Sequence, residues 1–218
     1  MRFLDVPYWL FVTLLLPFCP APVLAGETKQ LNWERFRGPN GTGTSDDQNI
    51  PLAFGASKNI IWKVELPGAG NSSPVVWGRH LFLHSASDDG KLRSLLCLDT
   101  SDGKIRWRKS IPADRARIRA DSSLASSTPT TDGQAVYVSF WDGKDIIVAA
   151  YDFQGEALWS KNLGSFNSQH GPGASPILYK DKLILANDMD KDDFNTHVPN
   201  VRPSMLIALD KPTFNLFR

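Results

Sequence analysis

The densest run of possible metal ligands lies at residues 188–193 (DMDKDD), where carboxylates alternate along the chain. Alternating carboxylates in a loop are the arrangement used by a Ca²⁺ site of the EF-hand kind. Here the glycine expected at the sixth position is an aspartate, and the glutamate expected at the twelfth is Pro199. Asp188, Asp190 and Asp192 are therefore candidates for a Ca²⁺ contact, and the alternative interpretation is a solvated loop between strands.

His170 stands in a Gly- and Pro-containing segment, residues 169–176 (QHGPGASP), which precedes an apolar stretch. Loops carry functional groups more often than the elements they connect. His170 is thus the candidate for a residue that faces a central channel, and the alternative is a structural hydrogen bond. His80 and His84 share one face of an expected strand without a third ligand. We therefore expect these two side chains to be exposed to solvent or hydrogen-bonded rather than bound to a metal.

The charge balance excludes one class of partner. The chain has 24 basic and 23 acidic residues, a formal net charge of +1, and a hydrophobic fraction of 42%. A nucleic-acid-binding surface would need a basic stripe, so no nucleic-acid partner is expected. Nucleophile-elbow, zinc-protease and Cys-x-x-Cys motifs are missing from the sequence, and no catalytic residue is assigned.

The N-terminus has the layout of a secretory signal peptide. An apolar run spans residues 8–18, and Val23-Leu24-Ala25 offers small residues for cleavage. The run is too short to cross a bilayer, so residues 1–25 are expected to be removed and the chain exported to the periplasm or the extracellular space. No membrane span is expected after cleavage. Cys97 is then the one cysteine left, and its apolar surroundings predict a buried, inert thiol.

A repeat organises the rest of the chain. Pro74, Pro129 and Pro176 each follow a small polar residue and precede a strand-like stretch, and they are spaced 55 and 47 residues apart. Such spacings fit blades of a β-propeller with insertions.

Each unit continues into a predicted hairpin. An apolar stretch ends at Asp99, Asp152 or Asp210, and the first two are followed by Gly103 and Gly155. The aspartate can bind the next backbone amides, and the glycine supplies the positive φ that the turn needs. A tryptophan closes the unit, as a large apolar wedge between neighbouring sheets. The closing tryptophans are Trp62, Trp107 and Trp159.

These patterns divide the chain into a signal peptide (1–25), a segment that precedes the blades (26–58) and a partial propeller (59–218). The propeller begins with a lone closing strand at about 59–68. Units at about 72–111, 127–164 and 174–218 follow it. The expected fold is all-β, with four-stranded blades of which about three are present.

The units resemble PQQ-like repeats, the blades of propellers of the quinoprotein alcohol dehydrogenase type. Residues 33–43 (WERFRGPNGTG) are similar to the beginning of large secreted propellers of the PQQ-binding-like kind. The resemblance implies blade architecture. It also raises PQQ and Ca²⁺ as cofactors, since the enzymes of this type bind both in the central channel with a catalytic aspartate and often a vicinal disulfide. No matching aspartate or Ca²⁺ set can be placed here, and one remaining cysteine excludes the disulfide.

The third unit departs from the pattern after Asp210, where residues 212–218 (PTFNLFR) replace the expected glycine and tryptophan. The departure predicts a fragment of a larger propeller that associates with itself through open blade edges. Three functions remain open. The first is an exported, non-catalytic binding or scaffold module with an unknown protein or small-molecule partner. The second is a quinoprotein dehydrogenase or its remnant. The third is a propeller similar to the outer-membrane assembly factor.

Overall fold

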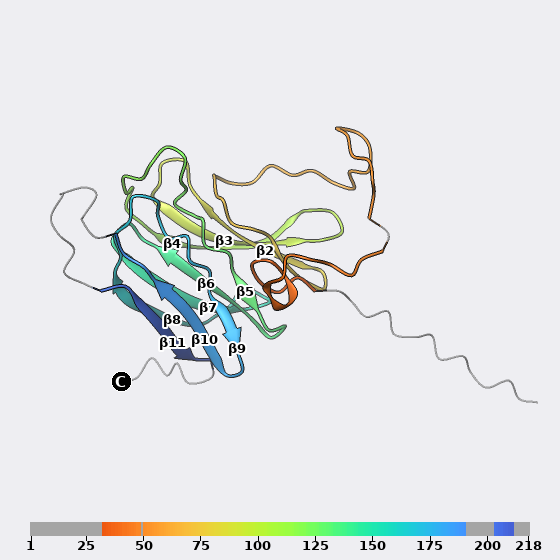
Figure 1. Ribbon diagram of the computed structural model, residues 1–218. Helices are drawn as coiled ribbons and strands as arrows, with labels where there is room; N and C mark the ends of the chain where they lie inside the picture. The colour runs from red at the N-terminus through yellow and green to blue at the C-terminus, as the bar shows by residue number, and fades with distance from the viewer. Residues whose placement is uncertain (1–31, 49, 191–202, 212–218) are drawn as a thin grey trace, which may run out of the picture.

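The computed structural model describes residues 32–48, 50–190 and 203–211. The predicted signal peptide and Asp192 lie outside these residues. The described chain contains three antiparallel sheets that follow one another in sequence and in space (Figure 1). Apart from one short 3₁₀ turn, η1 (Pro39–Gly41), the described elements are strands. The all-β propeller class predicted from the sequence is confirmed.

The first two sheets are complete blades with four strands in sequence order. Blade 1 contains β1 (Val75–Trp77), β2 (His80–Ala86), β3 (Leu92–Asp99) and β4 (Ile105–Pro112). Blade 2 contains β5 (Thr130–Thr131), β6 (Ala135–Trp141), β7 (Asp145–Asp152) and β8 (Ala157–Ser165). The third sheet, blade 3, has three described strands: β9 (Ile177–Tyr179), β10 (Lys182–Asn187) and β11 (Met205–Asp210).

The turn between β3 and β4 shows why these residues form a hairpin. The carboxylate of Asp99 accepts a hydrogen bond from the Ser101 amide at 2.8 Å, and the Gly103 amide donates to the Asp99 carbonyl at 2.9 Å. Gly103 has a φ of 71°, in the left-handed region that glycine adopts without a steric cost. Leu98 then pairs with Ile105 across the two strands.

Apolar side chains of neighbouring blades form two cores. The core between blades 1 and 2 contains Val75, Phe82, Leu95, Cys97, Val136, Val138, Phe140, Ala149 and Tyr151. The core between blades 2 and 3 contains Ala135, Tyr137, Trp141, Ile146, Val148, Ala150, Trp159, Phe166, Leu183, Leu185 and Leu209. Alternate residues of one strand enter different cores because successive side chains point to opposite faces of a sheet.

The inner strands are linked by hydroxyl groups of the repeated Ser/Thr-Pro pairs. The Ser73 amide donates to Oγ1 of Thr128 at 3.1 Å, and the Thr128 amide donates to Oγ of Ser175 at 3.0 Å. Each of these residues directly precedes the repeated proline. The small polar residue therefore carries a hydrogen bond from blade to blade.

The segment before the blades covers the inner edge of blade 1. The amide and carbonyl of Trp33 pair with Val76 at 2.8 Å in both directions, and the Thr131 amide donates to the Glu34 carbonyl at 2.9 Å. Residues 33 and 34 thus contact the inner strands of both complete blades. This pairing satisfies backbone groups that an inner edge strand would otherwise expose.

Candidate functional site

The closing tryptophans fix the spacing of the blades. Nε1 of Trp62 donates to the Thr100 carbonyl at 2.8 Å, and Nε1 of Trp107 donates to the Phe153 carbonyl at 2.9 Å. Both acceptors directly follow the aspartate of a turn in the next blade. Trp159 is buried between blades 2 and 3, with its ring 6.0 Å from that of Tyr137.

The repeated aspartates hold their own turns. Asp99 binds Ser101, Arg79 and Arg106, and these hydrogen bonds lower the pKa of its carboxyl. Asp152 accepts hydrogen bonds from the amides of Gln154 and Glu156. Asp210 pairs with Lys182. These contacts give the aspartates a role in the turn geometry.

One repeat position differs sharply between the blades. The residue three positions after the repeated proline is Trp77 in blade 1 and Asp132 in blade 2. Trp77 lies directly over Gly133 of blade 2: a Cβ built on Gly133 would come within 2.3 Å of the indole ring. In blade 3 the position of Gly133 is taken by Lys180, which has a φ of 54°. The ring-over-glycine contact of blades 1 and 2 is thus replaced by an aspartate and a lysine.

A groove of about 620 Å³ lies at this place between blades 2 and 3. It opens on the face that carries the β1–β2-type and β3–β4-type turns, called here the turn face. Its lining comprises Asp132, Gln134, Ala135, Tyr137, Asp152, Leu158, Lys180, Asp181 and Lys211. Leu158 is 50% exposed, although it is a large apolar side chain. The groove therefore combines an apolar wall with charges of both signs.

The carboxylate of Asp132 accepts several hydrogen bonds within the groove. Its carboxylate accepts hydrogen bonds from the amides of Gln134 and Ala135, each at 3.0 Å, from the Tyr137 hydroxyl at 3.2 Å, and from Nζ of Lys211 at 3.1 Å. Burial opposes ionisation of Asp132, but the two amides and the lysine outweigh it and lower the pKa of the carboxyl. The same burial and the neighbouring carboxylate raise the pKa of Tyr137. Asp132 is consequently ionised and Tyr137 neutral near pH 7.

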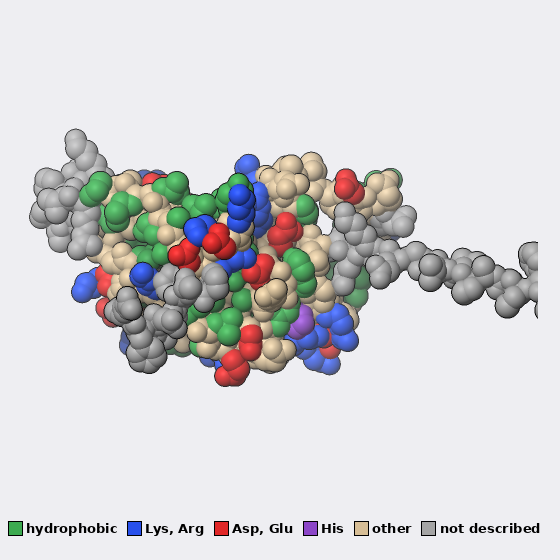
Figure 2. Space-filling model, turned by 90° about the horizontal axis from the view of Figure 1, so that it is seen from below, with side chains coloured by type: hydrophobic (Ala, Val, Ile, Leu, Met, Phe, Trp, Pro, Cys, Tyr) green, Lys and Arg blue, Asp and Glu red, His purple; other side chains and the backbone are tan. Residues whose placement is uncertain are grey.

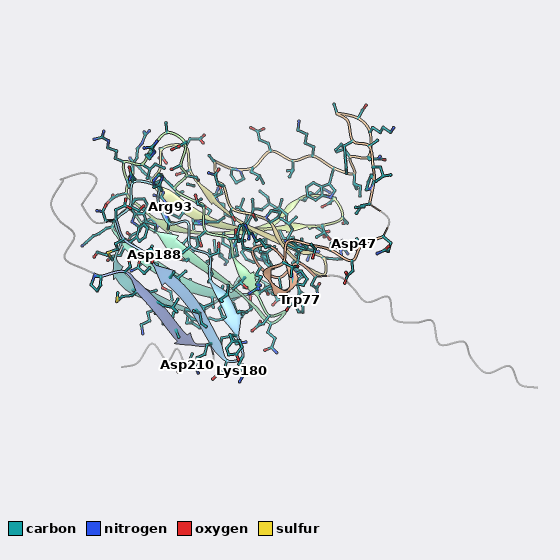
Figure 3. The ribbon with its side chains drawn as sticks, in the orientation of Figure 1. Asp47, Trp77, Arg93, Lys180, Asp188 and Asp210 are labelled. Carbon is teal, nitrogen blue, oxygen red and sulfur yellow. The ribbon has the colours of Figure 1, made fainter. Side chains whose placement is uncertain are left out.

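Figure 2 shows the turn face, where acidic and basic side chains are interleaved with apolar ones. In Figure 3, Lys180 and Asp210 lie at this end of the blades, whereas Arg93 and Asp188 lie at the opposite end. That opposite end carries the connections between blades and is called here the loop face.

The two Ca²⁺ candidates that the structure describes, Asp188 and Asp190, lie on the loop face (Figure 3). The Asp190 carboxylate accepts a hydrogen bond from the Gln169 amide at 2.7 Å, and its own amide donates to the Asn167 carbonyl at 3.1 Å. Asp190 thereby fixes a neighbouring loop. Among the residues that the structure describes, no three His, Cys, Asp or Glu side chains gather as metal ligands.

His170 is exposed on the loop face. Its Nδ1 lies 3.3 Å from Oγ of Ser122, and its amide donates to Oγ of Ser168 at 3.1 Å. The Arg119 amide donates to the Gln169 carbonyl beside it at 2.8 Å. His170 thus lies where the connection between blades 1 and 2 meets the connection between blades 2 and 3. Its role toward the channel remains a prediction.

Two titratable groups are buried between blades 1 and 2. His84 is 1% exposed, and among the described residues its ring nitrogens make no hydrogen bond of normal geometry; only a contact with the Ser127 backbone favours its protonated form. The exposed environment that was one of the two alternatives for His84 was wrong, because its side chain enters the blade interface beside Phe140. Burial lowers the pKa of His84 to about 3. Cys97 is buried, and burial raises the pKa of its thiol to about 12.

No sequence motif predicted the groove, although a comparison of the repeat units contains a signal for it. Aligning the units on their prolines places Asp132 beside Trp77 and Lys180 beside Gly133. The two exchanges occur together, because the two positions lie across the interface between neighbouring blades.

Within the described residues, no helix is both long and apolar enough to cross a membrane.

A family model of propeller repeats supports this architecture. A search of curated proteins gives no match. Among solved structures, the crystal structure of BamB from Moraxella catarrhalis matches with a TM-score of 0.44 and 16% sequence identity, covering 69% of this chain and 40% of that one. The chain thus spans less than half of that protein. The family model PQQ_2, described as outer membrane protein assembly factor BamB, matches residues 47–192, which is more than half of the sequence. The chain belongs to the PQQ_2 family of β-propeller repeat proteins.

Proposed function

We propose that this chain is an exported, non-catalytic propeller module that binds a polypeptide in the groove between blades 2 and 3. The observation that carries the proposal is the exchange of Trp77 and Gly133 for Asp132 and Lys180 at the next interface. Where the tryptophan is present it fills the space over its glycine. Where it is missing, a groove of about 620 Å³ stays open.

The lining of the groove supports a polypeptide as the ligand. Leu158 and Ala135 offer an apolar surface for one side chain of the ligand. Asp152 and Asp181 can accept hydrogen bonds from its backbone or from a basic residue, and Lys180 can donate to a carbonyl or a carboxylate. An extended segment with an apolar residue between polar ones satisfies all of these groups. A fully apolar or highly charged ligand would leave part of the lining unsatisfied.

A double exchange tests the proposal. Asp132→Trp with Lys180→Gly recreates at blades 2 and 3 the contact that Trp77 and Gly133 make at blades 1 and 2, and so fills the groove. A photoreactive residue at Leu158 reports whether a polypeptide lies there in the exporting cell. We expect Leu158 to cross-link to a polypeptide and the double exchange to suppress the product about tenfold or more.

The control is the same photoreactive residue at Arg106, which also directly precedes a closing tryptophan but lies in blade 1, whose next interface is filled. Equal cross-linking from both positions would contradict a site specific to the groove. So would an unchanged product in a double-exchange variant that keeps its thermal stability. Export itself is tested by N-terminal sequencing of the mature protein, which should begin at Gly26 after cleavage of the signal peptide.

A second candidate is a part in outer-membrane protein assembly, and it is favoured by the description of the matching family model. The groove would then receive a segment of another assembly component. Affinity purification of the tagged chain from membranes, with and without the double exchange, separates the two roles. Recovery of barrel-assembly components that depends on the open groove supports the second candidate. Recovery of other proteins only supports the general binding module.

A further inference from the structure

One face of blade 3 has apolar residues at the positions that contact the following blade in blades 1 and 2. Leu206 occupies the position of Leu95 in blade 1 and Val148 in blade 2, each four residues before the turn aspartate. Leu95 and Val148 are 0% exposed because the following blade covers them, whereas Leu206 is 77% exposed. Ile177 likewise is partly exposed at the position of the fully buried Val75. The side-chain types of an interface are present on blade 3, but nothing in the described part of the chain covers them.

The described part of blade 3 also has no fourth strand at its outer edge. In blades 1 and 2, β3 and β7 pair with the closing strands β4 and β8. The sheet order of blade 3 is β11-β10-β9, so the outer edge of β11 has no pairing strand among the described residues. An unpaired edge strand with exposed apolar side chains is a template for strand addition.

A segment that resembles a closing strand lies at the opposite end of the molecule. Residues 59–64 (NIIWKV) contain Trp62, which docks on blade 1 through the Thr100 carbonyl as Trp107 docks on blade 2 through the Phe153 carbonyl. This segment holds the place of a closing strand, yet it pairs with no described strand, and Ile61 is 91% exposed. Figure 1 shows it beside blade 1, at the far end of the array from β11.

We propose that a second copy of this chain completes blade 3, with residues 59–64 of one copy pairing antiparallel to β11 of the other. The register follows blade 1, where Leu98 pairs with Ile105 and Leu96 with Arg108. Aligning the tryptophans and the turn aspartates places Ile60 opposite Leu209, and Lys63 opposite Ile207. The inference extends beyond the groove and does not depend on it.

The addition explains the exposed apolar face as well as the unpaired edge. Because residues 59–64 are already docked on their own blade 1, pairing with β11 brings that blade onto blade 3 of the other copy. Leu206 and Ile177 are then covered as Leu95 and Val75 are covered within one chain. The contact joins two different surfaces, and repeating it at the other end closes a ring of two copies.

The test is the oligomeric state of the exported, mature chain, measured by light scattering after size exclusion over a range of concentrations. We expect a dimer or larger assembly. Leu206→Glu should raise its dissociation constant about tenfold or more, because a carboxylate would be buried without a partner. Leu52→Glu is the matched control: Leu52 is also apolar and is 97% exposed, but it lies outside the proposed contact and should leave assembly unchanged.

A cross-link tests the register. One tagged copy carries Lys63→Cys and the other Ile207→Cys, and mild oxidation of the mixture should join them. Lys63→Cys mixed with Asp181→Cys, on the turn face, should not join. A monomer at all concentrations would overturn the proposal. Equal weakening by Leu206→Glu and Leu52→Glu, or equal cross-linking of both mixtures, would also overturn it.

Discussion

The indole of Trp62 lies so close to Gly103 of the neighbouring blade that a Cβ built on Gly103 would come within 2.5 Å of the ring. Trp107 and Gly155 repeat the relationship one blade further on, at 2.9 Å. The glycine therefore serves two needs: it adopts the positive φ of the turn, and it leaves room for a tryptophan from the previous blade. Turn chemistry and blade packing meet at one residue.

Replacing this glycine should cost more than the backbone conformation alone. Gly103→Ala places a methyl group where Trp62 lies, in addition to forcing alanine to a φ of 71°. We expect a loss of about 3 kcal/mol in the free energy of unfolding, from a left-handed alanine and a displaced ring together. Urea denaturation followed by tryptophan fluorescence measures it.

Gly43 provides the control for this prediction. It has a φ of 74° with nothing within 4 Å of an added Cβ, so Gly43→Ala carries the backbone cost without the clash. Its expected cost is about 1–2 kcal/mol at most. Equal losses at both positions would show that the tryptophan contact does not limit the Gly103 site.

The hydroxyl link between inner strands gives a second prediction. Thr128→Val removes the Oγ1 that accepts the Ser73 amide but keeps the shape of the side chain. Because that amide is left without its partner in a partly buried place, we expect a loss of about 1 kcal/mol in the free energy of unfolding. Thr128→Ser keeps the hydroxyl and should cost less. If the two variants melt at the same temperature, the link contributes nothing to stability.

The sequence predicted the features that the repeat makes periodic. Proline spacing and the Asp–Gly–Trp pattern led to the all-β propeller with four-stranded blades, because turn residues and alternating strands are local signals. Contacts between blades carry no local signal. The pairing of Trp33 with Val76, and the open groove at Asp132, depend on which blades become neighbours.

Buried polar residues show the same limit. Arg93 interrupts an apolar strand, and its sequence context gives no hint of its environment. The structure buries it completely, with its guanidinium donating to the carbonyls of Gly90 and Asp114. The side chain thus ties the β2–β3 loop to the connection that leads to blade 2. Only the fold brings those carbonyls within reach.

Burial of His84 makes stability depend on pH. Its folded-state pKa of about 3 lies below its ordinary value of 6.5, so between these values the unfolded chain binds a proton that the folded chain does not. Stability is therefore unaffected by His84 above pH 6.5. It falls as the pH drops below that value, by up to about 1.4 kcal/mol per pH unit. Urea denaturation between pH 4.5 and 7 measures the slope.

Two variants isolate this histidine. His84→Leu removes this titrating group and should reduce the slope, whatever its effect on the absolute stability; His80, whose pKa is also lowered by burial, keeps its own share of the slope. His170→Leu makes the same substitution at an exposed histidine on the loop face and is the control for the exchange itself. Carboxylates with a lowered pKa, such as Asp132, begin to lose their stabilising contribution below about pH 5, so the slope that belongs to the histidines is read above that value. An unchanged slope in His84→Leu would mean that His84 is solvated in the folded protein.

Cys97 offers a way to watch the two complete blades separate. Its thiol is 0% exposed in the core between blades 1 and 2, and its pKa of about 12 leaves almost no thiolate near pH 8. Alkylation requires a solvated thiolate, so the native chain should react with iodoacetamide about a thousandfold more slowly than a free thiol. The expected labelling follows opening of the blade interface. If labelling rises with urea along the same curve as tryptophan fluorescence, the blades separate only when the whole domain unfolds. Labelling at lower urea shows that blade 1 detaches first.

A chain with Cys97→Ser and Gln154→Cys is the control for this prediction. Its thiol is exposed on a turn and should label at the free-thiol rate throughout. Native labelling of Cys97 at that rate would contradict the packed interface.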